Sequence, residues 1–577
     1  MTSLAVTERI TLPKPARRSL TARIGSRAAL FLEASHLRLC ALLVLLSLAC
    51  FLPGFVSLQP MDRDEPRYAQ ATKQMLESGD FVDIRFQDEA RHKKPVGIYW
   101  MQSAVVGLAG ALGVPEARTT VALYRIPSLL GALAAVLLTY WAALAFVPRR
   151  GAFLAAALMA SSILLTVEAH LAKTDAVLTA CSVAVMGGLA RAYLRRGTGE
   201  LSRPALVLFW LGMAVGLLVK GPIILMFSAT AALILSWRER SARWLMALRP
   251  KQGLIAVGAI VLPWFVAIAV KSGGAFFAAS VGQDMLAKVG GGQENHWAPP
   301  GFYLIAFFAT FWPGAILAAI AVPFWWAKRR DDPVAFALAW AVPSWLVFEA
   351  VPTKLPHYVL PLYPAIAILT AMAILHAFVG PRRPGAKLST LLIPAIPAAL
   401  AGGLVFAGLY FDDVVPFTAL PLLLASTGLA YAAWRAFGRG RVWRAAALAV
   451  VASPLLTMGT LGLAQNDLRS LKLSPRMAEV VRAASCADPQ VGSLGYREPS
   501  LVFLVGTRLD LFETGPEAAQ FLKSHPCSIV FVERRFEGAF RDEAARLQLQ
   551  PALSTRITGF NINGGRRLDL GAYAVSP

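Results

Sequence analysis

Two apolar stretches joined by a charged connection decide the fold class of this chain: GAFLAAALMASSILLTVEAHLAKTDAVLTACSVAVMGGLARAYL, residues 151–194. Each apolar half is close to the roughly 17–25 residues that a helix needs to cross about 30 Å of hydrocarbon. The connection EAHLAKTD places four ionisable side chains within eight residues. The stretch therefore predicts two membrane-spanning helices with functional groups in the short loop between them.

The same pattern continues along the chain and predicts a polytopic α-helical membrane protein. Of its 577 residues 56% are hydrophobic and only 16% are charged, whereas soluble domains carry about 25% charged residues. A stack of soluble domains and a disordered chain are both excluded. The predicted spans number about thirteen and cover 39–59, 127–147, 151–168, 176–194, 204–219, 221–237, 253–270, 301–326, 334–351, 358–378, 388–410, 416–436 and 444–464.

The net charge of +22 is explained by topology. Lys and Arg gather in cytoplasmic loops of membrane proteins, and every second gap between the predicted spans is basic. These gaps are 149–150, 195–203, 238–251, 328–330, 382–387 and 435–444. We therefore expect the basic tail 1–38 inside and the C-terminal residues outside, and no nucleic-acid partner is needed.

Residues 96–113, VGIYWMQSAVVGLAGALG, are the exception to this alternation. A full span here would reverse every later loop and place the arginine clusters outside. We therefore interpret the segment as a helix at the outer interface, where Tyr99 and Trp100 are well suited. The alternative is a fourteenth crossing.

The remaining hydrophilic segments define the predicted domains. The spans and their loops form a catalytic domain over 39–465, with an outer loop at 60–126 and a Gly-rich flap loop at 271–300. Short apolar runs alternate with helix-like stretches over 466–577, which predicts a soluble α/β domain. Of the five cysteines, only Cys486 and Cys527 fall outside apolar runs, so they are the one plausible disulfide pair.

Acidic side chains on the predicted outer face are the first candidates for chemistry. Asp62, Asp64 and Glu65 follow the first span directly, and carboxylates at a membrane surface are costly unless they bind something. Asp175 begins a later span and could face Asp64 across a cavity. The simpler alternatives are a solvated loop for the first group and a helix N-cap for Asp175.

Basic side chains on the same face form the second group. Lys93 and Lys94 precede Pro95, and Lys220 interrupts an apolar stretch of more than thirty residues. Snorkelling to lipid headgroups is the simpler explanation, and binding of a lipid phosphate is the functional one. The remaining candidates lie in the flap, which is otherwise a flexible connector, and in PTKLPHYVLPLYP: Lys288, Lys354, His357 and Tyr358.

Because carboxylates and cations share one face, the sequence predicts an outer-interface site for a lipid-linked anion. No phosphate-binding loop, dinucleotide fingerprint or zinc-protease motif is present. No cofactor is therefore certain, although a divalent metal stays open.

The motifs DRDEPRYA (62–69), KKPVGIYW (93–100), VKG (219–221) and KLPHY (354–358) resemble those of GT-C membrane glycosyltransferases. Within that superfamily, which includes protein O-mannosyltransferases, the match is to the type of the bacterial lipid A aminoarabinose transferases. The resemblance covers about 60–360. It departs at Lys93, where the family has Glu, so the resemblance does not carry over any role that needs a carboxylate there, such as holding a metal. It departs again at Lys288, where the family's flap usually offers Arg.

The resemblance implies an inverting transfer from undecaprenyl phosphate carrying one sugar to lipid A or a related envelope glycan. The enzyme would lie in the bacterial inner membrane, among its lipids, with its site and C-terminal domain facing the periplasm. Asp64 would be general base for a hydroxyl acceptor, or would orient the donor for a phosphate acceptor. Asp175 and Glu65 complete the candidate catalytic set. The candidates for the lipid phosphate and sugar are Arg67, Tyr68, Lys94, Tyr99, Lys220, Lys288, Lys354 and Tyr358.

Two other classes of protein stay open from the sequence. A lipid flippase would use intramembrane charges as a path, but no inverted repeat is found and the charges favour one face. An adhesion or scaffold protein would use 466–577 as its binding module.

Overall fold

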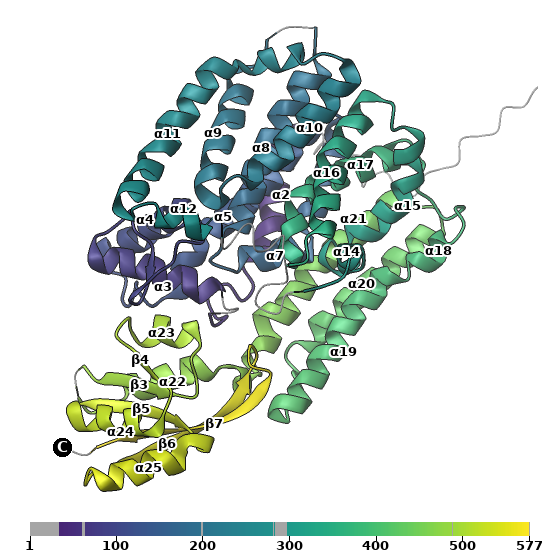
Figure 1. Ribbon diagram of the computed structural model, residues 1–577. Helices are drawn as coiled ribbons and strands as arrows, with labels where there is room; N and C mark the ends of the chain where they lie inside the picture. Colours follow the sequence, from purple (N-terminus) through teal and green to yellow (C-terminus); the bar gives the residue numbers. More distant parts are fainter. Residues whose placement is uncertain are drawn as a thin grey trace, which may run out of the picture.

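The structure is a computed structural model that describes residues 34–60, 64–197, 200–280, 282, 297–486 and 488–575. A large helical bundle stands beside a smaller region that contains a β-sheet (Figure 1). Most of the tail 1–38 and half of the predicted flap, including Lys288, lie outside the described residues.

The bundle is built from the apolar runs of the sequence. Its longer helices are α2 His36–Phe51, α5 Val121–Ala143, α6 Arg149–Ala160, α8 Asp175–Leu194, α9 Arg203–Lys220, α10 Ile223–Glu239, α11 Pro250–Lys271, α15 Gly314–Ala327, α16 Asp332–Ala350, α17 Tyr363–Leu375, α19 Leu392–Asp412, α20 Leu420–Gly438 and α21 Val442–Thr457. Shorter ones are α7 Ile163–Ala169, α12 Ala275–Phe277, α14 Phe302–Thr310, α18 Ala386–Ser389 and the 3-10 helices η1 Arg243–Leu248 and η3 Pro356–Leu362.

Within the described residues, eight helices are long and apolar enough to cross a membrane. The number becomes nine if α6 and α7, which meet at a 60° bend, form one broken span. The chain is therefore a multi-pass helical membrane protein, and the count of thirteen stays a prediction. The side chains of α8 are buried almost throughout, so it is a central helix of the bundle.

Two helices that do not qualify as spans close one end of the bundle: α3 Asp64–Ser78 and α4 Gly97–Ala111. A short hairpin of β1 Arg85–Phe86 and β2 Glu89–Ala90 lies between them in the sequence. With 15 residues α4 is about 22 Å long, which is short of the hydrocarbon thickness. Gly97 lets α4 approach α9, because a Cβ there would lie 2.7 Å from the Leu218 carbonyl oxygen.

The C-terminal region contains a five-stranded sheet of order β4-β3-β5-β7-β6. Strands β3, β4 and β5 are parallel, and β7 is antiparallel to both β5 and β6. Buried apolar clusters cover both faces of the sheet. The elements are α22 Leu473–Arg482, β3 Gln490–Leu494, α23 Pro499–Val505, β4 Asp510–Phe512, α24 Gly515–Ser524, β5 Ser528–Glu533, α25 Glu537–Arg546, β6 Ala552–Asn561 and β7 Arg566–Ala574.

A disulfide joins Cys486, just before β3, to Cys527, just before β5. It therefore links the starts of two neighbouring parallel strands. Cys40, Cys50 and Cys181, which lie in the bundle, are free. The two cysteines outside the apolar runs are thus the bonded pair.

Candidate functional site

A cavity of about 450 Å³ lies where α3, the chain after β2 and the ends of α8, α9 and α16 meet. Charged and polar side chains line it together with the apolar side chains of Met226, Val347 and Phe348. The candidates that line it are Asp64, Tyr68, Lys94, Asp175, Lys220 and Tyr358; with them are Arg91, Lys93, Lys173 and His357.

Asp64 reaches the cavity from the first turn of α3, where the partial positive charge of a helix N-terminus favours a carboxylate. Burial alone would raise the pKa of Asp64, but the charges of Lys173 and Arg91 and further cations hold that pKa below its ordinary value. Tyr68 lies one helical turn later, with the Arg91 guanidinium 5.0 Å from its ring centre. Asp64 is therefore an ionised acceptor beside cationic groups.

Glu65 follows Asp64 in the sequence, but its side chain is buried away from the cavity. Its carboxylate is fully buried and accepts from Arg125 Nε at 2.7 Å and Nη2 at 2.9 Å. Arg125 also donates to the carbonyls of Phe55 and Leu58. Glu65 Oε1 further accepts from the Ala172 amide at 2.9 Å. Glu65 does not line the cavity; it links the first turn of α3, which also carries Asp64, to α5 and to the turn before Asp175. The catalytic role of Glu65 stays a prediction.

The connection between α7 and α8 brings alternating charges together. Lys173 Nζ lies 3.5 Å from Glu168 Oε1, and Lys220 Nζ donates to Asp175 Oδ1. His357 lies 3.6 Å from the Glu168 carboxylate and 3.8 Å from that of Asp175. All five side chains are largely buried, where opposite charges must compensate one another.

The same group is where a divalent metal could be held. One ligand atom each from Glu168, Asp175 and His357 lies within 4.8 Å of the others, and carboxylates with imidazole are a common ligand set. Lys173 and Lys220 already neutralise the two carboxylates. In this structure the two lysines therefore balance the negative charges of Glu168 and Asp175.

Lys220 and Lys94, which the sequence predicts as phosphate ligands, both line the cavity. Lys220 Nζ is 5.3 Å from the ring centre of Tyr358. Gly221, at φ +69°, turns the chain directly after Lys220 into Pro222 and α10. This turn keeps the ammonium at the cavity wall while both helices continue away from it.

Three other predicted ligands do not line the cavity. Lys354 is buried and donates to the carbonyls of Phe348, Glu349 and Val351, so it caps the end of α16. Tyr99 is fully buried behind Tyr68, with ring centres 5.3 Å apart. Arg67 is half-buried on α3 and contributes to the electrostatics of Asp64. Lys354 therefore caps a helix and Tyr99 packs against Tyr68, and the ligand roles predicted for both stay predictions.

Comparison with known proteins adds an independent observation. The family model for dolichyl-phosphate-mannose-protein mannosyltransferase matches residues 36–275. The crystal structure of ArnT from Cupriavidus metallidurans bound to undecaprenyl phosphate superposes with a TM-score of 0.67, covering 92% of this chain and 97% of that chain at 17% identity. This chain has the ArnT fold. The prediction of a helical GT-C membrane fold is thereby confirmed.

Curated relatives carry the matching name, undecaprenyl phosphate-alpha-4-amino-4-deoxy-L-arabinose arabinosyl transferase. The one from Pectobacterium carotovorum is 26% identical over 65% of this chain and 66% of its own length. The one from Pseudomonas aeruginosa is 28% identical over 54% of this chain and 55% of its own length. The chain thus matches between about half and two thirds of the length of these relatives.

Two cavity residues of this ArnT fold were not named as ligands or catalytic groups from the sequence: Arg91 and Lys173. Arg91 lies two residues before Lys93, and Lys173 lies two residues before Asp175. The only sequence signal for these residues was therefore that they lie two positions from a candidate. In a loop of mixed charge, that signal does not distinguish a cavity residue from a solvated side chain.

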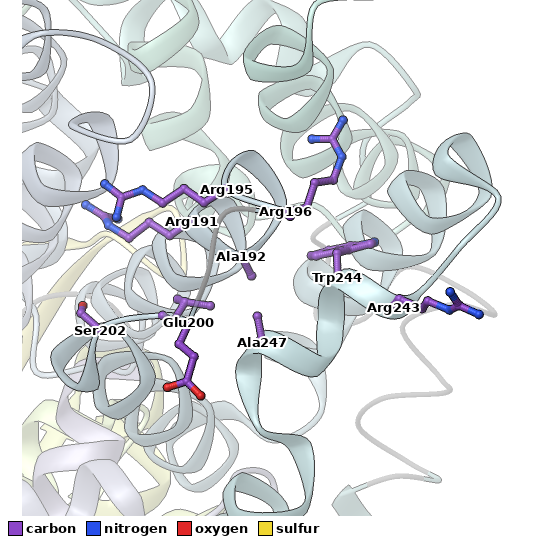
Figure 2. A pocket seen from close by; sticks show the side chains of 11 residues that line it. Arg191, Ala192, Arg195, Arg196, Glu200, Ser202, Arg243, Trp244 and Ala247 are labelled. Atoms are coloured by element: carbon purple, nitrogen blue, oxygen red, sulfur yellow. The ribbon is translucent and has the colours of Figure 1, made fainter.

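A second hollow of about 170 Å³ lies at the opposite end of α8 (Figure 2). Four arginines line it, but their guanidinium groups point apart: Arg191 and Arg195 to one side, Arg196 and Arg243 in two other directions. Arg191 donates to the carbonyls of Gly187 and Trp141, and Arg196 pairs with Glu239 and Asp332. These cations do not converge on one point, whereas Lys173 and Lys220 of the cavity each pair with a buried carboxylate.

Proposed function

We propose that the chain is an inverting glycosyltransferase that moves a sugar from a polyprenyl-phosphate donor to lipid A or a related cell-envelope glycan. An aminoarabinose-type donor is the first choice, because curated relatives carry that sugar in their name. The observation that carries the proposal is the cavity itself, where Asp64, Asp175, Lys94 and Lys220 meet beside an apolar wall.

The donor phosphate is best accommodated on the cationic side of the cavity. Lys94 and Lys220 would stabilise the negative charge that grows on the phosphate as the bond from the anomeric carbon to the phosphate oxygen breaks. The apolar side chains Met226, Val347 and Phe348 would accept the first part of the polyprenyl chain. Positioning of the two substrates supplies much of the remaining rate enhancement.

Asp64 is the group best placed to act on the acceptor. The charges around it keep it ionised, so it can take the proton of a hydroxyl acceptor as the new bond to the anomeric carbon forms. A phosphate acceptor needs no base, and Asp64 would then orient the donor sugar. Asp175, paired with Lys220, would hold that lysine toward the leaving phosphate. Attack opposite the leaving phosphate inverts the anomeric centre.

We further propose that the cavity and the C-terminal region face the periplasm. The disulfide between Cys486 and Cys527 supports this orientation, because disulfides persist in oxidising compartments. A membrane-impermeant thiol reagent should label these cysteines only after reduction, and in cells whose inner membrane is intact.

Sugar transfer in isolated membranes tests the proposed reaction. Wild-type membranes with a labelled polyprenyl-phosphate donor should label lipid A or an envelope glycan, and Asp64→Ala and Lys94→Ala should each lose transfer. Unchanged transfer in both variants would contradict the site. Mass spectrometry of lipid A and polysaccharide from cells with and without the gene identifies the sugar and the acceptor.

A further inference from the structure

The C-terminal region docks directly on the helix that carries Asp64. Helix α23 lies next to α3 (Figure 1). Lys73 Nζ donates to the Phe503 carbonyl at 3.2 Å, and Gln70 Nε2 donates to Thr507 Oγ1 at 2.8 Å. The Thr507 hydroxyl in turn donates to Glu77 Oε2 at 2.7 Å. The side of α3 that bears Gln70 and Lys73 is therefore covered by a segment more than 400 residues later in the chain.

Phe503 is the apolar centre of this contact. Its side chain is fully buried in a cluster with Ala69, Val106, Tyr124 and Ala172. The Tyr124 ring meets it edge-on, with centres 5.2 Å apart and planes at 87°. The cluster joins α3, α4, α5 and the turn before α8. One side chain of the C-terminal region thus fills the space where four elements of the bundle meet.

Two members of the cluster are sequence neighbours of cavity residues. Ala69 follows Tyr68, and Ala172 precedes Lys173. The backbone of Ala172 is held on both sides, by Glu65 through its amide and by Gln102 Nε2 at 3.1 Å through its carbonyl. Phe503 therefore supports, from behind, both segments that bring charged groups to the cavity.

We infer that Phe503 is a positioning residue for sugar transfer, through which the C-terminal region completes the rear wall of the cavity. The inference rests on the proposed function for its catalytic readout. Removing the ring leaves a void between α3 and the turn at 172–175, and both segments can shift toward it. A shift of about 1 Å at the reacting groups is enough to cost about a hundredfold in rate.

Steady-state kinetics of purified full-length variants tests the inference. Phe503→Ala should lower kcat about tenfold or more while the KM for the donor changes by less than about twofold, because the phosphate ligands remain in place. Phe503→Leu, which refills most of the void, should recover at least half of the decrease in log kcat that Phe503→Ala causes. If Phe503→Ala does not fold, Thr507→Val replaces it, with a smaller loss of kcat expected.

The chain offers a matched control in Phe560. This residue also joins the C-terminal region to the bundle, with its ring centre 4.9 Å from that of Phe411 near the end of α19, but it lies away from α3. Phe560→Ala should keep the wild-type kcat. Equal losses in Phe503→Ala and Phe560→Ala would overturn the inference, since general loosening of the C-terminal region would then explain both.

Hydrogen–deuterium exchange separates this inference from the proposed function. Phe503→Ala should speed exchange of backbone amides over 64–78 and 170–175, and Phe560→Ala should not. Wild-type protein that transfers no sugar would contradict the proposed function, yet the exchange comparison would still decide whether Phe503 positions these segments. Unchanged exchange in Phe503→Ala would overturn the inference even if transfer were confirmed.

Discussion

Helix α8 carries a basic hollow at each end, and the two hollows differ in how their charges are arranged. At the Asp175 end, Lys173 and Lys220 line a cavity of about 450 Å³ and each pairs directly with a carboxylate. At the Arg191 end, four arginines line about 170 Å³, but their guanidinium groups point apart (Figure 2). The number of cations is similar, so the buried carboxylates paired with lysine and the apolar side chains Met226, Val347 and Phe348 distinguish the proposed site.

The largest expected effect comes from Asp64. Asp64→Asn should lower the rate of sugar transfer by about 10²–10⁴ if it acts as general base, with protein level and thermal stability close to wild type. Asp88→Asn is the matched control, because Asp88 is an exposed aspartate of the same segment, 60–126, and does not line the cavity. A wild-type rate of transfer in Asp64→Asn would contradict the proposed role of Asp64 in the reaction.

The second prediction compares two lysine–aspartate pairs at helix ends. Lys220 is buried with Asp175 at the cavity, whereas Lys271 is exposed and pairs with Asp80 outside it. Lys220→Gln should reduce transfer about a hundredfold, since one donor to the leaving phosphate is lost. Lys271→Gln should reduce it by less than about threefold, because exposed pairs contribute little. Similar losses in both would show that the cavity confers no special role.

The third prediction is that substitution of Glu65 lowers the stability of the protein, whereas substitution of Asp64 lowers the rate of transfer. Glu65→Gln leaves Arg125 buried without its full counter-charge, and breaking a buried pair costs about 3–5 kcal/mol. Thermal unfolding should therefore shift to clearly lower temperature, with loss of transfer following the loss of folded protein. A variant as stable as wild type but inactive would support the catalytic role for Glu65.

The fourth prediction concerns pH. The pKa of Asp64 is lowered: burial opposes the shift, and Lys173, Arg91, His357 and Arg67 produce it. Asp64 thus stays ionised well below neutral pH, and its contribution is lost only as the pH falls through this lowered value. Transfer should be constant from pH 7 to about 5.

The pH experiment needs a control for the neighbouring imidazole. A fall in rate above pH 5 that persists in His357→Asn would contradict the assignment of the base, whereas a fall that disappears in His357→Asn would belong to His357.

The smallest effect is expected at the other end of α8. Arg195→Gln combined with Arg243→Gln should leave transfer within about twofold of wild type, because exposed charges that do not converge contribute little to binding. The same membranes and donor used for Lys220→Gln make the comparison direct. A loss as large as that of Lys220→Gln would show that this hollow also takes part in the reaction.

The sequence alone predicted the helical membrane fold because apolar run length and loop charge are local properties. It also selected Asp64, Asp175, Lys94 and Lys220, which the structure brings to one cavity, because each interrupts or borders an apolar run. It did not predict the pairing of Glu65 with Arg125, because Arg125 lies sixty residues away inside an apolar helix.

Lys354 and the C-terminal contact show the other limit. In the sequence, Lys354 looks like a ligand, but its ammonium caps the preceding helix. The contact of Phe503 with Ala69 and Ala172 joins segments hundreds of residues apart. No local sequence pattern predicts this contact. Predictions from sequence therefore identified the chemical groups better than their partners.

Binding of undecaprenyl phosphate to purified protein tests the central claim most directly, because it needs neither the sugar nor the acceptor. Lys94→Gln combined with Lys220→Gln should weaken binding at least tenfold, since two cations of the cavity are removed. Arg195→Gln combined with Arg243→Gln should leave the Kd within about twofold of wild type. Equal weakening by the two pairs, or none from the first, would contradict the claim that the cavity at the Asp175 end of α8 binds the lipid phosphate.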